Sequence, residues 1–262
     1  MVTQAIILAA GFGQRLRARS TSKPLTHVCG VSLLEISLRQ LVAVGVTRVV
    51  IVTGHEAQRI ELEARALVPR IDAAIETVQL EDWSRPNGWS VIAGARKLDV
   101  PFLLVMADHL FGDGLLARLA AQPLDDCDVV LATDALDNPL IDPDDATWVA
   151  CDDQRRIERI GKTIAPYDAV DCGAFLATNT LAEAIASAIA AGRPGSLSDG
   201  MQTLADARRA VTNDVGGVWW LDVDDPRALD LAEAQAAQHI GFLSARTALA
   251  PMPNTQGERR VA

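Results

Sequence analysis

The first half of the chain alternates between short runs of consecutive apolar residues and longer segments in which apolar residues recur every three or four positions. A continuous apolar run is typical of a strand that is buried on both faces, whereas the wider spacing is typical of an amphipathic helix. Residues 33–44 show the helical spacing, with apolar side chains at 33, 34, 38, 41 and 42. We therefore expect strands at 5–10, 48–53, 75–79, 102–106 and 129–133, and helices at 33–44, 56–68, 90–98 and 114–121.

This alternation predicts an α/β protein with a mixed, mainly parallel sheet that is covered by helices on both faces. In the less regular second half, 134–145 is a loop rich in Pro and Asp, and 147–151 and 156–162 resemble the strands of a small β insertion. We expect one domain over 1–242 and a mobile tail over 243–262, where the apolar residues have no strong period. Further strands are expected at 174–178 and 218–223, and further helices at 181–191 and 226–241.

The composition is that of an ordinary globular protein, since 49% of the 262 residues are apolar and 22% are charged. The formal charge of −10 disfavours binding to nucleic acid, but it does not exclude a small anionic ligand. No stretch approaches the roughly 18 uncharged apolar residues of a membrane span, so we expect no membrane insertion. The four cysteines are too widely spaced to suggest a zinc site or a disulfide framework, and we expect free thiols in the cytoplasm.

A glycine turn, GFGQRL at 11–16, follows the first expected strand. Ligands of open α/β sheets bind beyond the carboxyl ends of the strands. Gly11 and Gly13 allow a tight turn there, and their amides can surround phosphate oxygens. The turn lacks the third glycine of a dinucleotide fingerprint, and no acidic residue follows about 20 positions on, which disfavours a nicotinamide-dependent oxidoreductase. By itself the segment could also be a tight turn and nothing more.

The longer pattern is more specific: LAAGFGQRL at 8–16 is followed by TSKPL at 21–25. This combination resembles the signature of the nucleotidyltransferases that activate phosphorylated sugars and alcohols. The resemblance implies their Rossmann-like, GT-A-like fold and two catalytic cations, Arg15 and Lys23, with Lys23 stabilising charge on the α-phosphate. The residues that it places around the nucleoside triphosphate are Leu8, Ala9, Ala10, Gly11, Gly13, Arg15 and Lys23.

Three aspartates resemble the metal ligands of the same family. Asp108 ends the strand-like segment VMADH, while Asp222 and Asp224 lie in WWLDVDD. Carboxylate oxygens suit Mg²⁺, which also retains waters and phosphate oxygens. We expect Mg²⁺ as the cofactor, with Asp108 also close to the nucleotide. The alternative interpretation is that Asp108 caps a loop and that Asp222 and Asp224 belong to a solvated helix start.

The resemblance is closest to inositol-1-phosphate cytidylyltransferases. It rests on PNGWS at 86–90, MADH at 106–109, RIGK at 159–162, VDCGAF at 170–175 and WLDVD at 220–224. It implies contacts of the nucleotide with Asn87, Gly88 and Ser90. Lys162 matches the lysine that holds the phosphate of the acceptor. The other residues that it places around the acceptor are His109, Asp171 and Gly173.

The implied reaction is Mg²⁺-dependent: CTP and inositol 1-phosphate give CDP-inositol and pyrophosphate, by direct in-line attack of the acceptor phosphate on the α-phosphate. Such a displacement needs positioning and cations rather than a protein nucleophile. Cys172 replaces a family threonine and so lacks a hydroxyl that could bind a ligand. The acceptor could therefore instead be phosphocholine, a hexose 1-phosphate or another cyclitol phosphate. Another nucleoside triphosphate in place of CTP is also possible. A different class of function is a catalytically silent nucleotide sensor.

The resemblance also bears on partners. Many family members continue into a membrane-spanning alcohol phosphatidyltransferase, so we expect that downstream enzyme to be a separate protein here. The Ala-rich helix expected at 181–191 could be either core or interface, which leaves a homodimer possible.

Overall fold

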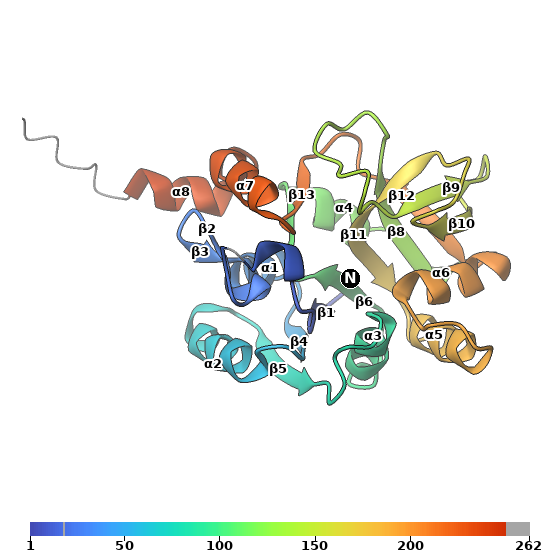
Figure 1. Ribbon diagram of the computed structural model, residues 1–262, viewed down its shortest axis with the longest axis horizontal. Coiled ribbons are helices and arrows are strands. Elements are labelled where there is room, and N and C mark those ends of the chain that lie inside the picture. The colour runs from blue at the N-terminus through green and yellow to red at the C-terminus, as the bar shows by residue number, and fades with distance from the viewer. Residues whose placement is uncertain (18, 250–262) are drawn as a thin grey trace, which may run out of the picture.

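The computed structural model describes residues 1–17 and 19–249, and a nine-stranded sheet forms the centre of this part of the chain (Figure 1). Four neighbouring strands are parallel, because a helix carries the chain from each of them to the start of the next. They lie in the order β6 (Phe102–Met106), β1 (Gln4–Ala9), β4 (Arg48–Thr53) and β5 (Ala74–Gln79).

Beyond β6 the sheet becomes mixed. The long strand β11 (Ala169–Ala177) is antiparallel to β6 and also to β8 (Val129–Asp134), so β8 runs in the same direction as β6. Strand β12 (Ala210–Asp214) is parallel to β8. The expected small β insertion is the antiparallel pair β9 (Trp148–Cys151) and β10 (Ile157–Gly161), which joins the same sheet through β11.

Helices cover both faces of the sheet because the buried strands alternate their side chains between two cores. In β1, Ala5 and Ile7 belong to one core and Ile6 and Leu8 to the other. The α/β architecture expected from the sequence is thereby confirmed. Residues of α1 (Leu33–Ala43), α2 (Ala57–Leu67) and α4 (Leu115–Ala120) complete the first core, and residues of α3 (Gly88–Ala95), α5 (Thr180–Ala190) and α6 (Leu197–Asp206) complete the second.

A third core joins the two ends of the described chain. Helices α7 (Pro226–His239) and α8 (Gly241–Leu249) pack here against residues of α1 and of two small antiparallel pairs. The pairs are β2 (His27–Val28) with β3 (Val31–Ser32) and β7 (His109–Phe111) with β13 (Trp220–Asp222). No helix within residues 1–17 and 19–249 has both the length and the hydrophobicity that a membrane crossing needs.

The expected start of a tail at residue 243 is corrected by α8. Residues 243–249 continue this helix, and Leu243 is 0% exposed in the third core. The helical period was missed because it lasts only about two turns and depends on packing against α7, which the sequence pattern does not show. The remainder of the expected tail, 250–262, lies outside the described residues.

The elements that the sequence pattern did not reveal are mostly short. β2, β3 and β7 have two or three residues each, too few for a period to emerge. Helix α6 is longer, and its N-terminus did carry a signal. The side chains of Ser196 and Asp199 form a reciprocal capping box, and the Ser-x-x-Asp spacing is a mark of helix starts.

The burial of Leu243 predicts a measurable contribution of α8 to stability. Replacing a fully buried leucine by alanine costs about 2–5 kcal/mol, so we expect Leu243→Ala to lower the free energy of unfolding by that order. Chemical denaturation of the whole chain would measure it. Leu62→Ala is the matched control, since Leu62 lies on helix α2 with 68% exposure and should change stability little. Equal stability of both variants and the parent would show that α8 is not docked.

Candidate active site

The functional side chains meet at the carboxyl edge of the parallel strands. β1 and β6 are hydrogen-bonded neighbours with Leu8 opposite Met106, so the glycine turn and Asp108 leave the sheet side by side. The pairing of β13 with β7 places Asp222 opposite His109. Two segments that lie more than a hundred residues apart in the sequence are thereby brought to one point.

A cavity of about 620 Å³ opens at this edge. Most of the residues predicted to bind substrates or metal line it. They are Arg15, Lys23, Asn87, Asp108, His109, Lys162, Asp171, Gly173, Asp222 and Asp224. Seven others, predicted as nucleotide contacts, are not among the lining residues: Leu8, Ala9, Ala10, Gly11, Gly13, Gly88 and Ser90.

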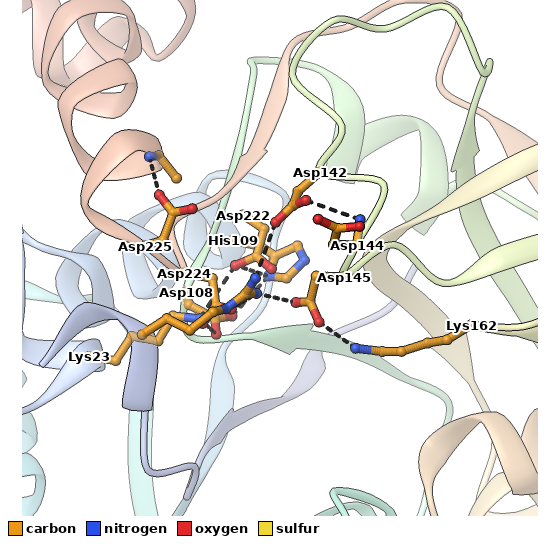
Figure 2. Close-up of polar contacts among 12 residues, drawn as sticks. Lys23, Asp108, His109, Asp142, Asp144, Asp145, Lys162, Asp222, Asp224 and Asp225 are labelled. Atoms are coloured by element: carbon orange, nitrogen blue, oxygen red, sulfur yellow. Dashed lines mark hydrogen bonds and ion pairs between the residues drawn. The ribbon is translucent and has the colours of Figure 1, made fainter.

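Lys23 is the central cation of the cavity (Figure 2). Its side chain is 9% exposed, and its Nζ lies 2.6 Å from Asp108 Oδ2 and 3.5 Å from Asp222 Oδ1, in contact also with Asp224. A side chain on Gly13 would place its Cβ 2.8 Å from Lys23 Cβ, and Gly13 has φ +60°. The glycine is therefore needed for the turn to pack against the lysine stem, although Gly13 does not line the cavity.

The electrostatics favour the charged forms of Lys23 and Asp108. Burial opposes charge on the ammonium, but the carboxylates of Asp108 and Asp222 outweigh it and raise the pKa of Lys23. Burial likewise opposes charge on Asp108, but Lys23 and His109 hold the pKa of that carboxyl far below its usual range. Burial raises the pKa of Asp222, although His109 and Lys23 act to lower it, so Lys23 and Asp108 form the ionised pair of the cluster.

His109 is held on three sides. Its Nδ1 lies 2.8 Å from Asp108 Oδ1, and its ring stacks on Trp220 with a centroid separation of 6.3 Å and an interplanar angle of 8°. The backbone of Gly173, at φ +76°, approaches so closely that a Cβ there would overlap the imidazole. Burial lowers the basicity of His109, but Asp222 and Asp108 overcome it and raise the pKa to about 9.

Arg15 and Lys162 share partners that sequence reasoning missed. Arg15 donates to Asp142 Oδ2 at 3.1 Å and to Asp145 Oδ2 at 2.5 Å, and it also contacts Asp224. Lys162 contacts the other oxygen of Asp145. A usable signal was present, because the Asp-rich loop 134–145 follows β8, which ends at the same edge as β6.

The segment 86–90, predicted to contact the nucleotide, is partly structural. Asn87 lines the cavity, and its Oδ1 accepts a hydrogen bond from the amide of Leu197 at 2.8 Å, at the start of α6. Gly88 packs so closely on the backbone of Gly195 that any side chain would overlap it, and Ser90 is buried within α3. The close packing of Gly88 fastens α3 to the turn before α6 and keeps Asn87 at the wall of the cavity.

Asp171 also lines the cavity, and its Oδ1 accepts a hydrogen bond from Gly173 N at 2.7 Å. Burial raises the pKa of Asp171 to about 6, against the effects of this hydrogen bond and of His109. Cys172, which replaces a threonine of the resembling family, is fully buried in the first core. The substitution therefore changes the packing behind the cavity rather than its lining.

Among residues 1–17 and 19–249, two groups of side chains place their ligand atoms close enough to hold a metal ion. One comprises Asp108, His109 and Asp222, and the other comprises Asp145, Asp222 and Asp224; within each group the ligand atoms lie within 4.8 Å of one another. Asp222 belongs to both groups. The predicted ligands Asp108, Asp222 and Asp224 are therefore brought together around Lys23, with Asp145 as an additional carboxylate.

Comparison with known proteins agrees with this fold. Residues 5–152, more than half of the chain, match the MobA-like NTP transferase domain. The chain therefore belongs to the MobA-like NTP transferase family.

Several curated relatives, among them the two described next, carry the name bifunctional IPC transferase and DIPP synthase. The relative from Rubrobacter xylanophilus is 36% identical to this chain, and the match covers 87% of this chain and 51% of the relative. The relative from Aquifex aeolicus is 29% identical, and the match covers 89% of this chain and 51% of the relative. This chain thus spans about half the length of these relatives. The solved inositol-1-phosphate CTP transferase from T. maritima matches 91% of this chain and 98% of its own, with a TM-score of 0.77 and 23% identity, which supports the fold.

The close approach of Gly173 to His109 predicts a sharp intolerance at that position. Gly173→Ala adds an overlap with the imidazole to the strain of a positive φ, so we expect a loss of unfolding free energy of about 2–4 kcal/mol and a displaced His109 in a crystal structure. Gly45→Ala is the control for strain alone, because Gly45 has φ +94° and open space around it. If both variants lose the same stability, His109 is not held by this contact.

Proposed function

We propose that this protein is a Mg²⁺-dependent nucleotidyltransferase that converts CTP and inositol 1-phosphate into CDP-inositol and pyrophosphate. The observation that carries the proposal is the convergence in one cavity of three cations, Arg15, Lys23 and Lys162, with the carboxylates of Asp108 and Asp222. Nucleotidyl transfer needs both kinds of group, since cations bind phosphate oxygens and carboxylates bind a divalent metal. Membership of the NTP transferase family supports the same chemistry.

The reaction balances without a covalent enzyme intermediate. An oxygen of the acceptor phosphate forms a bond to the α-phosphorus of CTP, and the bond from that phosphorus to the bridging oxygen breaks as pyrophosphate leaves. The acceptor phosphate is already ionised near neutral pH, so no general base is required. The site contributes by holding the two anionic reactants in line and by compensating the charge of the leaving group.

Each cation has a place in this scheme. Lys23, rigid because it is buried among carboxylates, would stabilise charge at the α-phosphate, and Arg15 would hold the triphosphate. Lys162 enters from the other side of the cavity and would hold the acceptor phosphate (Figure 2). His109, Asp171 and Gly173 line the same cavity and would contact the hydroxyl groups of the acceptor.

The carboxylates fit a Mg²⁺ ion by their chemistry. Asp108, Asp222 and Asp224 offer only oxygen donors, and all three already surround one positive charge, the ammonium of Lys23. When bound, the metal would neutralise triphosphate charge and support departure of pyrophosphate. Asp108, Asp222 and Asp224 would hold the ion in the cavity.

The choice of substrates rests on the relatives and motifs rather than on cavity shape. The R. xylanophilus relative is named as an IPC transferase, and the five short motifs of the sequence match inositol-1-phosphate cytidylyltransferases. Four nucleoside triphosphates should therefore be tested against inositol 1-phosphate, phosphocholine and hexose 1-phosphates, with pyrophosphate release as the readout. We expect CTP with inositol 1-phosphate to be fastest and EDTA to abolish the signal. If another pair of nucleoside triphosphate and acceptor is turned over faster, that pair replaces CTP and inositol 1-phosphate in the proposal. If none of the tested pairs is turned over, the proposed reaction is rejected.

A substitution of Asp222 tests the assigned metal ligand. Asp222→Asn removes one of the carboxylates around Lys23, so we expect Mg²⁺-dependent turnover to fall by about a hundredfold or more, as for other losses of transition-state charge stabilisation. Circular dichroism would confirm that the fold is intact. Turnover equal to that of the parent protein at the same Mg²⁺ concentration would remove Asp222 from the site.

Lys162→Ala tests the assigned acceptor contact. Loss of a charge-assisted hydrogen bond costs about 1.5–3 kcal/mol, so we expect KM for inositol 1-phosphate to rise about tenfold or more while KM for CTP changes little. Lys97→Ala is the matched control, because Lys97 pairs with Glu76 on the surface and is not among the residues lining the cavity. Equal increases in both KM values would show that Lys162 does not discriminate between the substrates.

A further inference from the structure

A row of alternating charges crosses the cavity. It runs from Asp108 through Lys23, Asp224, Arg15 and Asp145 to Lys162, each group in contact with the next. Five separate parts of the sequence contribute to it. The row runs from the end of β6 to Lys162, which directly follows β10, so it crosses the cavity beside the sheet that also joins these two strands.

Asp145 occupies a special place in this row, because it is shared between Arg15 and Lys162. Its Oδ2 accepts from Arg15 at 2.5 Å, and its Oδ1 contacts Lys162. Under the proposed function, on which this inference rests, Arg15 holds the nucleotide and Lys162 the acceptor. The carboxylate of Asp145 therefore links the two cations, Arg15 and Lys162, that are assigned to the two substrates.

The loop that carries Asp145 is anchored, so the carboxylate has a defined position. Asp134 Oδ2 accepts hydrogen bonds from Trp220 Nε1 and from Asn138 Nδ2, both at 2.8 Å. Further along, Leu140 packs against the third core and Ile141 against the first. The amide of Asp145 itself donates to Asp142 O at 3.2 Å. These contacts are typical of a rigid support rather than of a lid.

Both cations keep donors for substrate. A guanidinium has five N–H donors, and Arg15 makes three contacts, one each with Asp142, Asp145 and Asp224. An ammonium has three donors, and Lys162 makes one contact, with Asp145. Lys162 is 58% exposed, and Asp145 is its ionic partner within the described residues. Without that partner its four-carbon stem would sample many rotamers.

Asp145 is charged when it makes these contacts. Partial burial acts to raise its pKa, but the hydrogen bonds and charges of Lys162 and Arg15 outweigh this effect and hold the pKa of Asp145 below its ordinary value. We propose that Asp145 is a positioning residue, which fixes Arg15 and Lys162 relative to each other so that the triphosphate and the acceptor phosphate meet in line.

The kinetic test compares two aspartates of one loop. Partly exposed ion pairs are weak, so we expect Asp145→Asn to raise KM for CTP and KM for inositol 1-phosphate each by about two- to fivefold. Asp145→Glu restores the charge and should bring both KM values part of the way back to those of the parent protein. Asp137→Asn removes the same charge from the same loop, but Asp137 is exposed, is not among the residues lining the cavity and has no ion pair within the described residues, so neither KM should rise.

A second pair of variants separates positioning from a general structural effect. Because Asp145 acts on the acceptor through Lys162, Asp145→Asn should not raise KM for the acceptor further when Lys162→Ala is already present. It should still raise KM for CTP in that background, through Arg15. A further rise in KM for the acceptor would indicate structural damage and would overturn the proposal.

Other results are equally decisive. Unchanged or lowered KM values in Asp145→Asn would overturn the positioning role, and a raised Mg²⁺ requirement without a change in KM would make Asp145 a metal ligand instead. If the parent protein turns over none of the tested substrate combinations, the proposed function fails by itself. Crystal structures of the parent and of Asp145→Asn then decide the inference: displaced Arg15 and Lys162 side chains support it, and unmoved ones refute it.

Discussion

The site depends on the buried ammonium of Lys23. Three aspartates from two strand ends converge on it, and without a central positive charge their mutual repulsion in a poorly solvated cavity would oppose the fold. The lysine comes from the segment just after the glycine turn, so one ion cluster joins the N-terminal signature to the end of β6 and to β13. The charges of the site therefore come together only when these three segments pack against one another.

Two glycines make this cluster possible because they have no side chain where a Cβ would overlap a neighbouring residue. Gly13 leaves room for the stem of Lys23, and Gly173 leaves room for the ring of His109. Both have positive φ, which other residues adopt at a cost. Their positions within motifs that resemble substrate-binding signatures are thus explained in part by packing around the charged groups.

The acidic charge of the whole chain coexists with a cavity suited to anions. Arg15, Lys23 and Lys162 form ion pairs with the cavity carboxylates of Asp108, Asp142, Asp145, Asp222 and Asp224. Arg15 and Lys162 have more N–H donors than these pairs use, so donors are left for phosphate oxygens. Metal binding at the aspartates would add further positive charge at that point. Net charge describes the solvated surface, whereas anion binding depends on the arrangement of a few groups in a cavity of low dielectric.

Local patterns in the sequence were enough to predict the α/β class and the parallel core strands, because buried strands and amphipathic helices leave such patterns. Arg15, Lys23, Asp108 and Asp222 were instead implied by the resemblance to nucleotidyltransferase motifs, and all four line one cavity in the structure. Only the tertiary structure decided that Asp142 and Asp145 belong to the site, that Gly88 and Cys172 serve packing, and that α8 is docked. These features depend on contacts between residues that are mostly far apart in the sequence, and no local pattern records which distant side chain will lie within reach.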